Sequence, residues 1–154
     1  MQRIAIVLGC AVLAAVAADA PVAHVWKAAE LHQLPQTLGP KVDPKSQMTM
    51  MKLAQVGASA VSFALREASG GAELHETQAD VIVAQTGEAT LITGGTIVDA
   101  KTTQPHEVRG SAITGGTETE LAPGDFVIIP AGTPHQMKLA AGKQFAYLVM
   151  KVGQ

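Results

Sequence analysis

The chain has 154 residues, a length that favours one domain, and 47% of them are hydrophobic against 16% charged and 3% aromatic. This composition supplies a core built mainly from Val, Ile, Leu and Ala. The net charge of −2 leaves no basic surface of the kind that binds nucleic acid, so we expect no nucleic-acid partner. Beyond the N-terminal stretch, no run of about 18 apolar residues is present, so the body of the chain is not expected to span a membrane.

Residues 1–18 have the organisation of a secretory signal peptide. Arg3 provides a basic start, a long apolar run follows, and the sequence Ala-Val-Ala ending at Ala17 fits a cleavage site. We therefore expect cleavage after Ala17 or Ala18 and an exported protein, either periplasmic or secreted. The alternative is an N-terminal anchor or a buried helix. Cys10 is the only cysteine, so cleavage would leave a mature protein without a disulfide.

Residues 19–52 form the next unit, which we interpret as an N-terminal arm and loop. The segment "HVWKAAELHQL" predicts one short helix, with Trp26 and Leu31 packing on the body. Pro35 and Gly39 follow and are expected to break regular structure.

Residues 53–154 have a different pattern, in which short apolar segments rich in β-branched residues are separated by Gly, Pro, Asp and Thr. They are "SAVSFALR", "DVIVAQT", "ATLITGG", "SAITGG", "GDFVIIP", "HQMKLAA" and "KQFAYLVMKV". This spacing is typical of an all-β sandwich or barrel, and the absence of helical segments between the strands disfavours a parallel sheet. We expect an antiparallel β-barrel of the jelly-roll type.

The segment "GDFVIIPAGTPHQM" places a histidine directly after a tight turn. Pro130 ends the preceding strand because it cannot donate to a ladder, and Gly132 can take a positive φ in the turn. In the strand that follows, His135 shares a face with Met137 and Leu139. That face should be the interior, so His135 points inward and needs a polar partner, a ligand or a metal.

A second polar group lies in "GGAELHETQADVIVAQTG". Glu73 and His75 share one strand face, and Asp80 lies on the strand that follows. Two imidazoles with one carboxylate form a set that suits Fe(II), Mn, Ni or Zn. Spacing alone does not bring the two halves of this set together.

The two segments resemble the two motifs of the cupin superfamily. The second motif is Gly, five residues, Pro, one residue, Gly, two residues and His, and it is matched without a gap from Gly124 to His135. In the first motif, Asp80 takes the place of Glu, His75 is the second His and Glu73 stands where the first His is expected. An alternative alignment makes His75 the first His and Thr77 the second.

The resemblance covers about two thirds of the chain and implies an antiparallel barrel with one site at its mouth. It implies His75, Asp80, His135 and Glu73 as ligands of a divalent metal such as Fe, Mn, Ni or Zn. It also implies a small-molecule ligand and a homodimer as candidate partners. A polar core cluster without metal is the alternative at the same residues.

Two further residues lie in the expected barrel near this site. Arg66 is interpreted either as a solvated strand end or as a group that holds an anionic substrate, and the solvated end is favoured. Tyr147 is expected in the core with its hydroxyl at the rim.

Three functions are consistent with these residues. The first is a metal-dependent enzyme of the dioxygenase, isomerase or lyase type, in which the metal acts as a Lewis acid or binds substrate. The second is a non-catalytic module that binds a sugar or an organic acid, with or without metal. The third is a structural barrel whose site is vestigial. The fold alone does not choose among them, since one fold hosts many chemistries.

Overall fold

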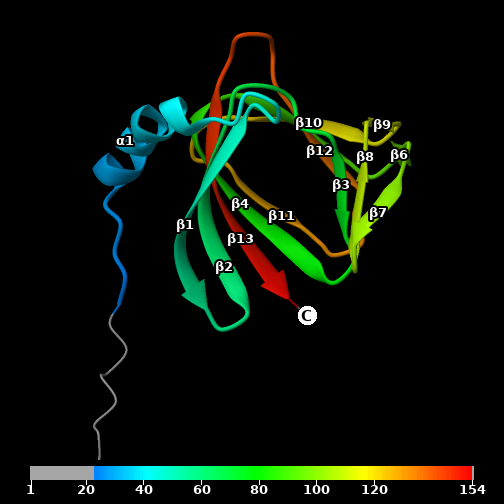
Figure 1. Ribbon diagram of the computed structural model, residues 1–154, viewed down its shortest axis with the longest axis horizontal. Helices are drawn as coiled ribbons and strands as arrows, with labels where there is room; N and C mark the ends of the chain where they lie inside the picture. The colour runs from blue at the N-terminus through cyan, green and yellow to red at the C-terminus, as the bar shows by residue number, and fades with distance from the viewer. Residues whose placement is uncertain (1–22, 154) are drawn as a thin grey trace, which may run out of the picture.

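The computed structural model describes residues 23–153, and antiparallel β-structure accounts for most of them (Figure 1). The proposed signal peptide, including Cys10, lies outside the described residues. The order β1-β2-β13-β4-β11 makes a five-stranded sheet from Met48–Val56, Ser59–Arg66, Phe145–Gly153, Gln78–Gly87 and Phe126–Ile129. Every pairing in this sheet is antiparallel.

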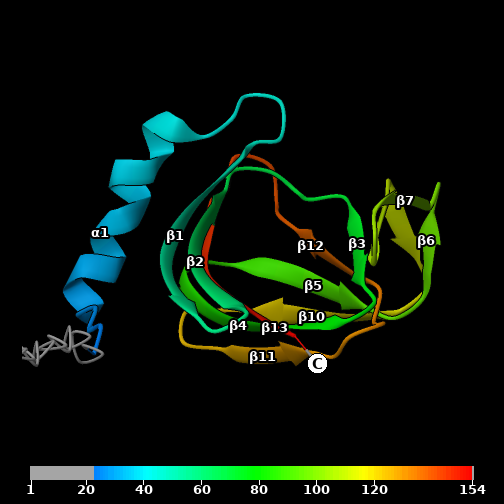
Figure 2. The same ribbon diagram turned by 60° about the horizontal axis from the view of Figure 1, so that its bottom comes forward.

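A six-stranded sheet has the order β10-β5-β12-β3-β8-β7. Its strands are Thr117–Leu121, Ala89–Thr93, His135–Lys138, Ala72–His75, Glu107–Gly110 and Lys101–Gln104. The two sheets face each other as the walls of an open barrel (Figure 2). The expected all-β jelly-roll architecture is therefore confirmed.

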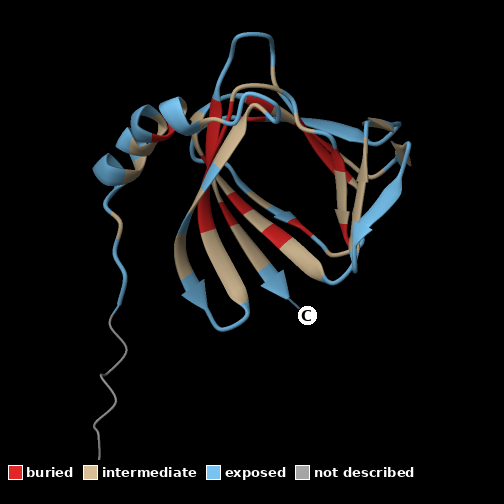
Figure 3. Cartoon of the chain, viewed as in Figure 1, coloured by how far each residue is buried: buried red, intermediate tan, exposed pale blue. Residues whose placement is uncertain are grey.

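The barrel interior is the main core. Buried residues of the strands line it, and Figure 3 colours the buried residues of the barrel strands red. They include Ile82, Leu91, Ile129, Met137, Tyr147 and Val149. Along β4, alternation sends every second residue from Asp80 to Ala84 to this inner face, because successive side chains point to opposite faces of a sheet.

The outer face of the five-stranded sheet carries a second core under the helix α1 (Ala28–Leu38). Leu38 is buried there with Phe63, Leu65 and Ala146, and Leu31 packs against this cluster. The helix continues through Pro35, where the sequence predicted a break. The short 3-10 helix η1 (Gly39–Lys41) follows and leads into the loop before β1.

A small two-stranded sheet, β6 (Thr96–Val98) with β9 (Ala112–Thr114), covers the outer side of the six-stranded sheet. Gln136 points to that side and is buried. Its amide oxygen accepts a hydrogen bond from Ile113 N at 3.3 Å, and its amide nitrogen donates one to Gly70 O at 2.8 Å. The face of β12 opposite His135 is therefore also closed. The described residues contain no helix with the length and apolarity needed to cross a membrane.

Candidate metal centre at the barrel mouth

The structure brings together all four residues that the sequence singled out. Glu73 and His75 lie on β3, Asp80 lies on β4 and His135 begins β12. Strand register places His135 directly opposite Glu73. The Nε2 atoms of His75 and His135 lie 3.4 Å and 3.5 Å from Asp80 Oδ2, and His75 Nε2 lies 3.6 Å from Glu73 Oε2.

Both imidazoles are oriented by a hydrogen bond at Nδ1. His75 Nδ1 lies 2.8 Å from the carboxylate of Glu107, and His135 Nδ1 lies 3.0 Å from the carbonyl oxygen of Thr133. Carboxylate and carbonyl oxygens only accept, so the proton sits on each Nδ1. Each Nε2 then faces the common centre, as it does in metal-binding histidines whose other ring nitrogen is held by an oxygen acceptor.

Lys151 on β13 reaches the same centre, and the sequence analysis did not select it. Its ammonium lies 2.8 Å from Asp80 Oδ1 and 3.1 Å from Oδ2, and it also contacts His75 Nε2. The register of β13 on β4 sets Lys151 directly opposite Asp80. Strand parity with the buried Tyr147 and Val149 is the sequence signal that could have placed Lys151 inward.

The pKa values of the buried groups reflect these contacts. Burial by itself would raise the pKa of Asp80, but hydrogen bonds from His135 and His75 and the nearby Lys151 ammonium outweigh it and hold this pKa well below its usual range. For His75, burial lowers the pKa, while the hydrogen bonds to Asp80 and Glu107 outweigh burial and the repulsion from Lys151, so the net shift is upward. These contacts therefore keep Asp80 in its ionised form.

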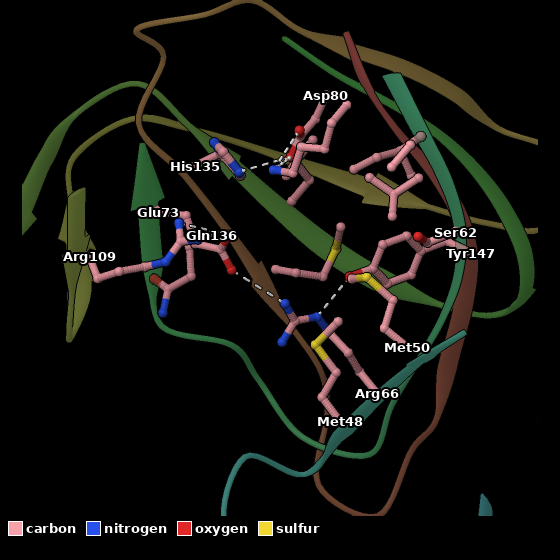
Figure 4. A pocket seen from close by; sticks show the side chains of 16 residues that line it. Met48, Met50, Ser62, Arg66, Glu73, Asp80, Arg109, His135, Gln136 and Tyr147 are labelled. Atoms are coloured by element: carbon pink, nitrogen blue, oxygen red, sulfur yellow. Dashed lines mark hydrogen bonds and ion pairs between the residues drawn. The ribbon is translucent and has the colours of Figure 1, made fainter. Parts of the chain in front are cut away.

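A cavity of about 370 Å³ opens beside this centre (Figure 4). Its apolar wall consists of Met48, Met50, Ile82, Leu91, Met137 and Val149. Its polar wall includes Arg66, whose Nε donates to the hydroxyl of Tyr147 at 3.0 Å and whose Nη2 lies 3.4 Å from Glu73 Oε1. Arg66 is 8% exposed, so the prediction of a solvated strand end is wrong. β2 turns this side chain into the barrel, toward the same space as Tyr147.

Glu73 is shared between two arginines. Besides Arg66, it contacts Arg109 on β8 at 3.1 Å, and Arg109 also pairs with Glu107 at 2.8 Å. The register of β8 on β3 explains this network, since Glu73 lies opposite Arg109 and His75 lies opposite Glu107. Sequence reasoning missed Glu107 and Arg109, because nothing in the pattern of the segment "TTQPHEVRG" shows that it pairs with β3.

The charges around the centre balance. Three carboxylates, Glu73, Asp80 and Glu107, lie among three cations, Arg66, Arg109 and Lys151. Buried or half-buried charges persist only when they are paired, and here each carboxylate contacts at least one cation.

The donors fit a divalent metal by chemistry and by spacing. The ligand atoms of Glu73, His75 and His135 lie within 4.8 Å of one another. Ligands that share one metal at about 2.1 Å lie roughly 3 to 3.5 Å apart, close to the separations between the imidazoles and Asp80. The protein thus contains a His and Glu cluster that could bind a metal, provided that the Lys151 ammonium leaves.

The comparisons with known proteins agree with this fold. No protein-family model matches the sequence, and a search of curated proteins found no similar sequence. Among solved structures, a cupin-2 domain of Rhodospirillum rubrum is similar over 70% of this chain and 61% of its own, with 17% identity and a TM-score of 0.51. The chain therefore has the cupin fold, and the structural neighbours include cupin-2 conserved barrel domains.

Two enzymes are among the similar structures. The polyketide cyclase of Streptomyces resistomycificus matches 70% of this chain and 66% of its own, with 20% identity and a TM-score of 0.50. The DMSP lyase of Ruegeria pomeroyi matches 72% of this chain and 49% of its own, with 18% identity and a TM-score of 0.51. This chain thus spans about two thirds of the length of the polyketide cyclase and about half of the length of the DMSP lyase.

Proposed function

We propose that this protein binds a divalent metal at Glu73, His75, Asp80 and His135 and a small molecule in the adjoining cavity. The observation that carries the proposal is the orientation of both imidazoles. Each Nδ1 is held by an oxygen acceptor, and each Nε2 faces a carboxylate across the mouth of the barrel. Fe, Mn, Ni and Zn are the candidate metals, since mixed imidazole and carboxylate sites suit all four.

The chain's own residues would bind and orient the small molecule. Arg66 and Tyr147 present a guanidinium and a hydroxyl to the cavity, while the methionines of β1 and β12 exclude water from its apolar wall. A metal bound beside them would polarise a carbonyl or carboxylate oxygen of the ligand. We propose a dioxygenase, isomerase or lyase type of reaction, because these use a ligand held against a Lewis acid in a small cavity.

The second candidate is a metal-free module that binds a sugar or an organic acid. The Lys151 ammonium among the ligand atoms favours it, because the charges around the site already balance without a metal. In this case Arg66 and Tyr147 would bind the ligand by themselves, and no turnover is expected.

Elemental analysis of protein purified without chelator or affinity metal distinguishes the two. We expect about one metal ion per chain, lost in both His75→Ala and His135→Ala. His106→Ala is the matched control, because the side chain of His106 is 61% exposed and pairs with Glu76, outside the metal centre. Metal-free wild-type protein whose stability survives both site substitutions would favour the metal-free module.

We further propose that the protein is exported to the periplasm or secreted, based on residues 1–18. N-terminal sequencing of protein recovered from the exported fraction tests this, with cleavage expected after Ala17 or Ala18. Uncleaved protein that stays in the cytoplasmic fraction would contradict it.

We also propose a homodimer. Phe126 and Ile128 on β11, an edge strand of the five-stranded sheet, are 62% and 60% exposed. A second copy that packs on this strand would remove both side chains from water.

A further inference from the structure

The Lys151 ammonium lies among the atoms that would hold a metal. It donates hydrogen bonds to Oδ2 of Asp80 and Nε2 of His75, and it also forms an ion pair with Oδ1 of Asp80 at 2.8 Å. Both residues, Asp80 and His75, are proposed metal ligands. The Lys151 ammonium is therefore a cation that already lies beside Asp80 and His75.

The position of Lys151 is fixed by the sheet rather than by chance contact of a long side chain. Lys151 lies directly opposite Asp80 in the β13–β4 ladder, so the two side chains emerge side by side on the inner face. The Asp80 side chain is 6% exposed, and a carboxylate buried to this degree needs a cation.

We propose that Lys151 is a built-in cation that alternates with the divalent metal, so that the site holds one or the other but not both. This inference rests on the proposed metal site. Both cations require the same lone pair of His75 Nε2 and the same oxygens of Asp80. Two cations that share these acceptors would also repel each other at close range, in a place where water screens little.

The structure provides a place for the displaced ammonium. A second cavity of about 250 Å³ lies on the outer side of the centre, lined by His75, Thr103, Gln104, Glu107, Arg109 and Lys151. Lys151 lines both cavities, and its side chain is 30% exposed. Rotation about the flexible four-carbon stem would move the ammonium outward toward the Glu107 carboxylate, where it keeps an ionic partner.

The first measurement is the affinity for Co²⁺, determined by calorimetry on chelator-treated wild-type protein and on Lys151→Met. Methionine keeps the length of the stem and removes the charge. We expect Co²⁺ to bind roughly tenfold or more tightly to the variant, because it no longer has to displace an ammonium. Lys138→Met is the matched control, since Lys138 is exposed on β12 and does not contact the centre. Its affinity should equal that of the wild type.

The second measurement needs no variant and guards against a Lys151→Met protein that fails to fold. Brief acetylation of lysines in wild-type protein, followed by peptide mass spectrometry, reports how accessible the Lys151 amine is. We expect slow modification of Lys151 without metal and faster modification with Co²⁺ bound. Lys138 should react at the same rate in both states.

The outcomes separate this inference from the proposed function. Equal Co²⁺ affinity in wild type and Lys151→Met, with unchanged acetylation, overturns the alternation while the metal site stands. Co²⁺ binding to Lys151→Met but not to wild type refutes both metal binding by the natural protein and the alternation, because Lys151 would then occupy the site permanently. If neither protein binds Co²⁺, both proposals fail.

Discussion

Gly132 donates its backbone N–H to the carbonyl oxygen of His75 over 2.8 Å, which joins the turn before β12 to the end of β3. This bond links the two sequence segments that carry the candidate metal ligands. His135 follows the turn at a fixed spacing, so the bond also sets how closely it approaches His75. The two rings lie with centroids 5.3 Å apart. The site is therefore positioned by backbone pairing, before any metal or ligand binds.

Glu107 should control metal affinity without being a ligand. Its carboxylate holds Nδ1 of His75 at 2.8 Å and thereby aims Nε2 at the centre. We expect Glu107→Gln to weaken Co²⁺ binding about tenfold and Glu107→Ala about 10- to 100-fold, as calorimetry would show. Glu118→Ala on the exposed part of β10 is the control and should bind as the wild type does. Unchanged affinity in Glu107→Ala would show that this carboxylate does not orient His75.

Gly87 at the end of β4 should tolerate no side chain. A Cβ there would lie 2.0 Å from the carbonyl oxygen of Gln144, and the φ of Gly87 is +75°. We expect Gly87→Ala to lower the free energy of unfolding by about 3 kcal/mol or more, measured by urea denaturation. Gly142→Ala separates the steric clash from the backbone strain, because Gly142 has a similar φ of +72° but open space around it. It should cost only about 1 kcal/mol. Equal losses in the two variants would remove the steric explanation.

Tyr147 should ionise at unusually high pH. Burial raises its pKa above the ordinary value, against the opposing effect of Arg66. Tyr147 is the only tyrosine of the chain, so the phenolate absorbance in the ultraviolet follows this group alone. The stability that the neutral hydroxyl provides is complete below about pH 10 and is lost as the pH rises above it, since the unfolded chain ionises first.

Arg66→Met tests the cause of this shift. The substitution removes the cation that lowers the pKa of Tyr147, so the pKa should rise further. A pKa of Tyr147 in the folded variant that is equal to or below the wild-type pKa would show that Arg66 does not lower it.

The edge strand β11 should form the dimer contact. Light scattering is expected to give the mass of two chains for the wild type and of one chain for the double variant Phe126→Ser and Ile128→Ser. Val56→Ser is the control, since Val56 is equally exposed but lies at the end of β1. A monomeric wild-type protein would refute the homodimer.

Local sequence determined the strands and the direction of several side chains. Alternation of apolar residues predicted the β-strands, and the parity argument placed His135 on the same inner face as Met137, where both are buried. The predicted helix, residues 24–34, has the observed length but lies four residues too early, because Pro35 indicates a break that the helix does not make. Proline is tolerated there because Leu34 and Leu38 continue to pack on the sheet.

Strand alternation and the turn at Gly132 are local properties, set by the period of two along a strand and by the backbone freedom of glycine, so the sequence alone determined a β-barrel with His135 pointing inward. Register between distant strands decided the rest of the site. It set Lys151 opposite Asp80, Glu107 opposite His75 and Arg109 opposite Glu73. Pairing between strands depends on packing of the whole barrel, and a shift by one residue would turn each side chain to the other face. For that reason only the tertiary structure showed that the Lys151 ammonium lies among the candidate metal ligands.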